Sequence, residues 1–298
     1  MHVNVVKMIA KKAILCIMEY AEISLYGGWS MYRLLVVTNE PDVLDRVNST
    51  MNWESLNFRP PMIVNTADQA IDAMETKRVD CVAYMLRSSE ARKLSNYLNN
   101  IRPSLPIFEI RRKPEAQIAI LHDMQKVLDR LHGDYADEVY DEKAIMSILR
   151  DELTHNLLAG EITNEKELRA RLEMLRSHLS LTKQCVVYEF DLPQGEVYLN
   201  FQWHYGSERL EKALRNNFFG RYYEDLYYQV AVLTPRNIRV MVCQRDDREN
   251  EPEDSLVERA DKHVNKVLED IKEYLGLDMI MTHREALPSI AVLTRQVQ

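Results

Sequence analysis

Residues 32–41 read YRLLVVTNEP, and they indicate a buried β-strand that passes directly into a helix. Four consecutive apolar residues, Leu34 to Val37, are typical of a parallel strand covered on both faces, because such a strand shows no alternation. Asn39 and Glu40 end this run, and Pro41 is suited to the first turn of a helix. The run therefore predicts the first strand of an α/β sheet.

Further strands and helices are predicted to alternate along the first half of the chain. Short apolar runs recur at 62–64, 80–85 and 105–110, and helical patterns lie between them at 66–74 and 90–101. This alternation predicts a parallel sheet with helices on both faces. After the fourth run the chain enters a helix directly, so no fifth strand is expected.

The second half has a different order of elements. Residues 186–191 read as a strand, 206–219 as a helix, 227–233 and 238–243 as a hairpin, 253–275 as a long helix and 277–282 as a final strand. The order β-α-β-β-α-β is typical of ferredoxin-like and cyclase-like palm domains. Between the halves, residues 114–160 are rich in helix formers and predict a helical connector.

Composition excludes several classes of protein. The chain has 298 residues, of which 46% are hydrophobic and 28% charged, so wholesale disorder and low complexity are excluded. Residues 31–132 carry 14 basic and 13 acidic residues, whereas residues 133–298 carry 21 basic and 31 acidic residues. The net charge of the whole chain is −8, and because a strongly acidic chain repels a phosphate backbone, we expect neither half to bind nucleic acid.

Residues 1–30 are expected to be an N-terminal extension that is not native, with Met31 as the natural start. The longest uncharged run there, Ala13 to Met18, is too short for a membrane span. The alternative is an amphipathic helix at a membrane surface. We therefore expect a cytoplasmic protein without a membrane span.

The four cysteines predict no metal site. Cys16, Cys81, Cys185 and Cys243 lie far apart, and no pair has metal-ligand spacing. We expect reduced, buried thiols, and we expect no cofactor.

The first half resembles the receiver domain of AraC-type response regulators of the YesN kind. The resemblance rests on YRLLVVTNEP at 32–41, on MNWESLNF at 51–58 and on RVDCV at 78–82. It implies a flavodoxin-like receiver domain over 31–113. The second half resembles the middle domain of the same regulators through RDEL at 150–153, LLAG at 157–160 and ELRARL at 167–172. It implies a ferredoxin/cyclase-like palm over 161–298.

The resemblance also implies that the receiver chemistry has been lost. Thr38 and Asn39 stand where the family has a magnesium-binding acidic pair, and Met85 stands where it has the phosphate-accepting Asp. With Glu40 and Arg87 these residues form the expected degenerate pocket. Met85 is interpreted as a packing residue; the alternative is that this face binds another ligand or a partner.

The palm is expected to be equally inactive. Asp191 occupies the place of a first metal-binding carboxylate, but the second acidic ligand and the cyclase signature at the hairpin are missing. Two-metal chemistry cannot proceed with one carboxylate, so Asp191 is interpreted as a vestigial metal position.

The resemblance implies a regulatory protein and no enzymatic activity. We expect the regulatory portion of a two-component transcription factor. It would form a homodimer through the connector at 114–160, and its partner would be a sensor kinase or a small molecule. DNA would be bound only by a helix-turn-helix domain absent from this chain. Two alternatives stay open: a nucleotide-binding, degenerate diguanylate-cyclase-like module, and a stand-alone interaction scaffold.

Overall fold

The computed structural model describes residues 31–295 except 44, 46–51, 135–140 and 245–251. The expectations for residues 1–30, and for Cys16 among them, lie outside the described residues. The chain divides into two compact units with a boundary between Asp129 and Arg130, apart from Pro106–Phe108, which group with the second unit. The expected connector therefore contributes one helix to each unit.

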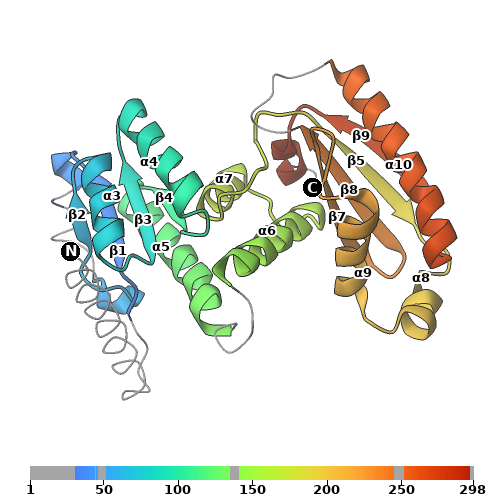
Figure 1. Ribbon diagram of the computed structural model, residues 1–298, viewed down its shortest axis with the longest axis horizontal. Helices are drawn as coiled ribbons and strands as arrows, with labels where there is room; N and C mark the ends of the chain where they lie inside the picture. The colour runs from blue at the N-terminus through green and yellow to red at the C-terminus, as the bar shows by residue number, and fades with distance from the viewer. Residues whose placement is uncertain (1–30, 44, 46–51, 135–140, 245–251, 296–298) are drawn as a thin grey trace, which may run out of the picture. The chain divides into compact units, whose positions relative to one another are not determined.

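The first unit contains a four-stranded sheet that is parallel, as the sequence predicts, and its strand order is β2-β1-β3-β4 (Figure 1). Its strands are β1 (Leu34–Thr38), β2 (Met62–Val64), β3 (Cys81–Met85) and β4 (Ile107–Glu109). All five residues of β1 are buried, because this strand has a neighbour on each side and helices above and below. No fifth strand joins this sheet within the described residues.

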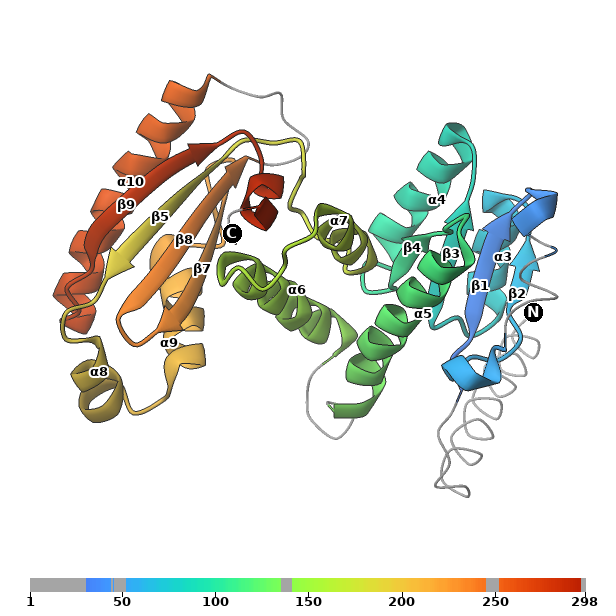
Figure 2. The ribbon, with the colours of Figure 1, turned by 180° about the vertical axis from the view of Figure 1, so that it is seen from behind.

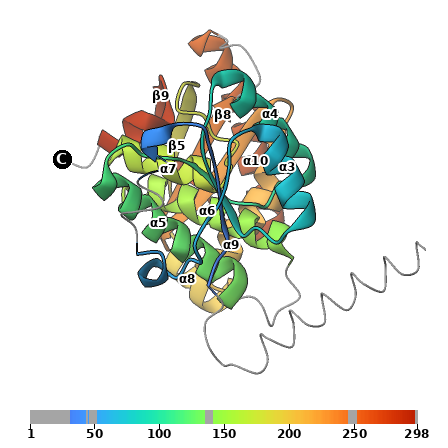
Figure 3. The ribbon, with the colours of Figure 1, turned by 90° about the vertical axis from the view of Figure 1, so that its left-hand side faces the viewer.

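Helices cover both faces of this sheet. They are α3 (Ala67–Thr76), α4 (Ser88–Ile101) and α5 (Pro114–Asp129), with the short helix η1 (Glu54–Leu56). Figure 3 shows α3 and α4 on one side of the sheet and α5 on the other. A hydrogen bond joins the last turn of α5 to the segment before β1: the Tyr32 hydroxyl donates to Asp129 Oδ1 at 2.5 Å.

The second unit contains a five-stranded sheet in the order β6-β7-β8-β5-β9. Its strands are β5 (Cys185–Asp191), β6 (Tyr222–Tyr223), β7 (Leu226–Thr234), β8 (Asn237–Gln244) and β9 (Ile280–Leu287), and all pairs are antiparallel. The prediction for the last strand, 277–282, was wrong in its bounds. It missed residues 283–287, because the exposed His283, Arg284 and Glu285 interrupt the apolar pattern before the buried Leu287.

The helical elements of the second unit follow the expected order. They are η2 (Arg130–Asp134), α6 (Glu142–Leu158), α7 (Glu165–Met174), α8 (Gly195–Val197), η3 (Tyr198–Trp203), α9 (Ser207–Ala213), η4 (Leu214–Phe219), α10 (Glu253–Leu275) and η5 (Ile290–Arg295). The helix predicted over 206–219 is present as α9 followed by one π-helical segment, η4. No described helix is both long and apolar enough to cross a membrane.

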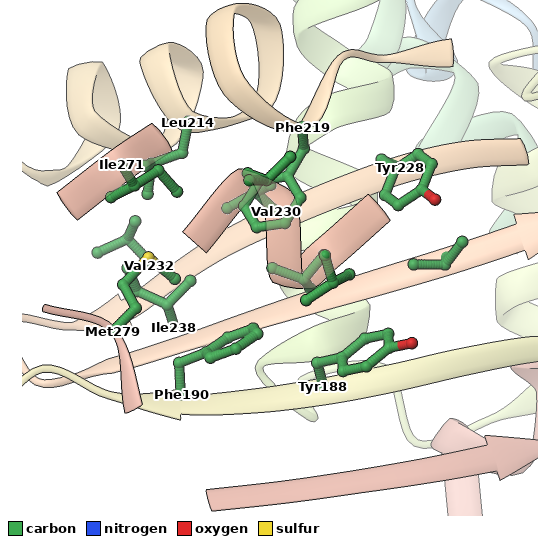
Figure 4. Close-up of a cluster of buried hydrophobic side chains, with 14 of the residues drawn as sticks. Tyr188, Phe190, Leu214, Phe219, Tyr228, Val230, Val232, Ile238, Ile271 and Met279 are labelled. Atoms are coloured by element: carbon green, nitrogen blue, oxygen red, sulfur yellow. The ribbon is translucent and has the colours of Figure 1, made fainter. Parts of the chain in front are cut away.

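One face of the second sheet carries the main hydrophobic core. Successive side chains of a strand point to opposite faces, so Val186, Tyr188 and Phe190 of β5 all lie on this face. The Tyr188 and Phe190 rings stack with centroids 6.2 Å apart (Figure 4). Helices α9 and α10 cover this face, as Figures 1 and 2 both show.

The opposite face is covered in part by α6. This helix packs on β7, and Arg239 Nη1 of β8 donates to the Leu158 carbonyl at 2.8 Å. Six apolar residues of α6 are buried: Ile145, Met146, Leu149, Leu153, Leu157 and Leu158. The three described cysteines are also buried and reduced, as predicted.

Gly195 allows α8 to pack directly against the β7–β8 hairpin. A Cβ at this position would lie 1.7 Å from the Pro235 carbonyl oxygen, which is backbone and cannot swing away. Gly195→Ala is therefore expected to destabilise the protein by about 3 kcal/mol through overpacking. The free energy of unfolding, measured by urea denaturation, checks this value.

Gly276→Ala is the matched control. Gly276 has a φ of 65° at the end of α10, and a Cβ there would meet nothing within 4 Å. Only the left-handed conformation is then penalised, by about 1 kcal/mol. If both variants lose the same stability, the close approach at Gly195 does not constrain the fold.

Candidate functional site

The five residues of the expected pocket lie at the carboxyl end of the first sheet. Thr38 ends β1 and Met85 ends β3, and the two are register partners on neighbouring strands. Asn39 and Glu40 follow β1, and Arg87 precedes the first turn of α4. The structure thus places these residues at one edge of the sheet.

The polar groups at this edge are poorly suited to hold a cation. Thr38 is fully buried, and its Oγ1 accepts a hydrogen bond from the Glu40 backbone N–H at 3.2 Å. Asn39 is exposed, and Glu40 supplies the one carboxylate among residues 38–40 and 85–87. Magnesium binds through carboxylate oxygens in an octahedral arrangement. These residues therefore do not fit the magnesium ion of a phosphate-accepting receiver.

Met85 and Arg87 provide no phosphate acceptor. Met85 is half-buried, and its thioether carries no oxygen. Arg87 is exposed in an extended conformation, and its side chain makes no capping hydrogen bond to α4. The chemistry that remains at this edge is one amide, one carboxylate and one guanidinium.

Asp80 lies at the other end of β3 and has a structural role. Its side chain accepts hydrogen bonds from the Arg33 backbone N–H at 2.8 Å and from Arg78 Nε at 3.0 Å. It is 6% exposed. These bonds join the start of β3 to the start of β1, so Asp80 is distant along the strand from the Met85 edge.

Gln117 organises the loop after β4 and was missed by the sequence analysis. Its Oε1 accepts a hydrogen bond from the Arg111 backbone N–H at 2.7 Å, and the side chain is buried. A lone glutamine in the first turns of an amphipathic helix gives no signal of such a role.

Asp191 pairs with the hairpin of the second sheet. It ends β5, and Arg236 Nη2 lies 3.2 and 3.3 Å from its two carboxylate oxygens. The Arg236 carbonyl also accepts a hydrogen bond from the Leu192 N–H at 2.8 Å. The Asp191 carboxylate therefore links β5 to the hairpin. Among the described residues, no cluster of three His, Cys, Asp or Glu side chains could hold a metal ion.

A buried ionic cluster joins α6 to α9 and η4. Asp151 Oδ2 accepts from Arg215 Nη2 at 2.8 Å and from Arg221 Nη2 at 2.9 Å. Arg215 is 4% exposed. Removing one partner of such a pair leaves an uncompensated buried charge, so each member constrains the others. The partners are more than 60 residues apart, and no local pattern predicts them.

Glu211 extends this cluster along the edge of β7. Its Oε2 accepts hydrogen bonds from His155 Nδ1 at 2.8 Å and from the Val232 backbone N–H at 3.0 Å. The bond from Glu211 raises the pKa of His155, and partial burial of the imidazole opposes this effect.

Docking of α6 is therefore expected to depend on pH through His155. A histidine with a raised pKa in the folded state stabilises the fold fully below its unfolded pKa, and this contribution is lost as the pH rises through the folded value. We expect the free energy of unfolding of the native chain to fall, relative to His155→Gln, from about pH 5.5 upward through the folded pKa, which lies above the ordinary histidine value of about 6.5. Urea denaturation of both proteins across this range measures the difference.

His283→Gln is the control for this titration. His283 lies in the second unit, 3.8 Å from Glu285, and it is 60% exposed. Solvent screens such a pair, so its removal should leave the pH profile almost unchanged. Parallel profiles for the native chain and His155→Gln would show that the His155–Glu211 bond does not contribute.

The comparisons with known proteins give no family for this chain. A scan against protein-family models finds no matching family. A search of the curated proteins finds no significant match. The function must therefore be argued from the residues and geometry described above.

Proposed function

We propose that this chain is the regulatory portion of a two-component transcription factor of the AraC/YesN type. Its first unit would be a receiver-like domain that cannot accept phosphate. Its second unit would be a degenerate, cyclase-like palm. In this proposal the protein acts through dimerisation or by sensing a partner or ligand, and it catalyses no reaction.

The observation that carries the proposal is Met85 at the end of β3, beside the buried Thr38. In the family that the sequence resembles, this edge has an Asp in place of Met85 and an acidic pair at residues 38 and 39. A receiver of this family accepts the phosphoryl group on a carboxylate oxygen, and the magnesium ion that assists the transfer is held by carboxylates. Both requirements are unmet by the residues at this edge.

The order of the strands also supports the proposal. The order β2-β1-β3-β4 with parallel pairing agrees with the first four strands of the flavodoxin-like arrangement. In the second unit β7-β8-β5-β9 is the order expected of a ferredoxin-like palm, with β6 added at the edge. Topology alone does not determine function. The proposal therefore rests on the residues at the carboxyl end of the first sheet, Met85 above all.

Dimerisation through the connector would have to use exposed residues. The buried residues of α5 include Ile120, Leu121, Met124 and Leu128, and those of α6 are buried in the second unit. Ile118 of α5 is 43% exposed and is available to a partner. A sensor kinase or a small molecule remains the proposed input, and DNA would be contacted by a helix-turn-helix part outside these 298 residues.

Incubation with acetyl phosphate and magnesium tests the loss of receiver chemistry. We expect no stable adduct of one phosphoryl group, about 80 Da, on the native chain in intact-mass spectrometry. The reason is that Met85 offers no acceptor and residues 38 and 39 offer no acidic pair. A stable adduct on the first unit would contradict the proposal.

Asn39→Asp combined with Met85→Asp is the matched gain-of-function variant. It restores an acceptor beside two neighbouring carboxylates, Asp at 39 and the native Glu40, without altering the buried Thr38. An adduct on this variant alone would show that the scaffold supports the chemistry once the residues are supplied. Circular dichroism checks that the variant keeps the native fold.

The second candidate function is a nucleotide-binding module related to diguanylate cyclases. It is favoured by the β-α-β-β-α-β order and by Asp191, which lies at the end of β5 opposite the hairpin that carries Arg236. The lack of a second acidic ligand beside Asp191 argues against catalysis. Binding without catalysis is the form of this function that the residues allow.

Calorimetry with GTP and with cyclic dinucleotides distinguishes the two candidates. Our main proposal predicts no saturable heat, whereas a nucleotide-binding palm predicts a Kd on the order of 1 μM, about −8 kcal/mol. Arg236→Ala should then weaken binding, because the guanidinium is the positive group at the hairpin. Arg284→Ala, on the edge strand, is the control for a general loss of positive charge.

A further inference from the structure

Two buried cysteines face each other across neighbouring strands of the second sheet. Cys185 begins β5, Cys243 lies next to the last residue of β8, and the two are register partners in the antiparallel ladder. Their exposed fractions are 0% and 3%. Cys81, in contrast, lies in the first unit and pairs with Leu34.

The ladder fixes the type of this pair. At the adjacent position, the Gln244 N–H donates to the Gln184 carbonyl at 3.5 Å. Hydrogen-bonded and non-hydrogen-bonded pairs alternate along an antiparallel ladder, so Cys185 and Cys243 form a non-hydrogen-bonded pair. The Cα atoms of such a pair are about 4.5 Å apart. A disulfide requires a Cα separation of about 4.4–6.8 Å.

Because the two residues are directly opposite in the ladder, their side chains lie on the same face of the sheet as neighbours. A hydrogen bond between the two thiols raises the pKa of Cys243, and burial acts in the same direction. The resting pair is therefore a neutral dithiol, which is a poor nucleophile. Reaction needs an opening of the strand ends that lets a thiol ionise and meet an oxidant.

We propose that Cys185 and Cys243 are a modification site, at which a small disulfide such as glutathione disulfide converts the thiol pair to a cross-strand disulfide. One thiol loses its proton and attacks the glutathione disulfide, which releases one glutathione and forms a mixed disulfide. The second protein thiol then displaces the other glutathione. The protein pair is oxidised by two electrons, and two glutathione thiols carry away the electrons and protons.

The product would connect β5 to β8 covalently at one end of the sheet. Its closed loop runs from Cys185 to Cys243 and contains α9, η4 and β7, so it restricts the unfolded chain over this part of the second unit. The oxidised protein should consequently resist thermal unfolding better than the reduced protein. This inference concerns the second sheet alone and does not depend on the proposed regulatory function.

Refolding in glutathione redox buffers tests the site. The full chain is unfolded in urea and reduced, then either refolded or kept in urea at the same ratio of glutathione to its disulfide. Thiols are trapped by alkylation, and the Cys185–Cys243 disulfide is quantified by peptide mass mapping. Refolding starts from the unfolded chain, in which both thiols are exposed. Slow access of glutathione disulfide to the buried pair therefore does not limit the measurement.

We expect the equilibrium constant for this disulfide to be at least about tenfold higher in the refolded chain than in urea, because the native sheet brings the thiols together. Cys81→Ser should leave the value unchanged, whereas Cys185→Ser and Cys243→Ser should each abolish the product. An equal or lower constant after refolding would overturn the proposal, and so would a folded product in which Cys243 is paired with Cys81.

Discussion

Both sheets depend on an interior strand that is largely buried and has a neighbour on each side. In the first unit β1 lies between β2 and β3, and in the second unit β5 lies between β8 and β9. The ladders on its two sides satisfy the backbone hydrogen bonds of such a strand. Its stability then depends on its side chains, which have to be covered on both faces of the sheet. In the second unit this requirement brings α9 and α10 to one face and α6 toward the other.

The same requirement limits the chemistry that the first sheet can carry at its carboxyl end. Thr38 belongs to the buried strand, and its hydroxyl binds the Glu40 N–H. A carboxylate at this position would have to coordinate a metal ion, because burying it without a partner has a large desolvation cost. Two carboxylates elsewhere in the chain have structural roles. Asp80 joins two strands, and Asp191 joins β5 to a hairpin.

The sequence predicted those parts of the fold that have a local signal. The uninterrupted run Leu34–Val37 and the alternation through Tyr188 and Phe190 each report burial directly, because burial sets the pattern of apolar residues. The edge position of Thr38 and Met85 followed from the same runs, since both residues end a parallel strand. Their loss of receiver chemistry was an expectation drawn from a family resemblance, and it stays a proposal.

The features that the sequence could not predict depend on contacts between distant segments. Asp151 meets Arg215 and Arg221 only after α6 has packed against the second sheet. The second half of β9 was missed because His283, Arg284 and Glu285 are exposed on an edge strand and show no apolar pattern. The opposition of Cys185 and Cys243 depends on strand register, which no spacing in the chain encodes.

The bond from the Val232 N–H to Glu211 has a consequence for how the protein behaves at high concentration. Among the described residues, the short strand β6 is the one strand that pairs with the outer side of β7, and an open edge offers backbone groups to the strands of other molecules. The Glu211 carboxylate occupies one of these donors and places a negative charge where an incoming strand would have to pair. A side chain that fixes α9 to the sheet thus also protects that sheet from aggregation.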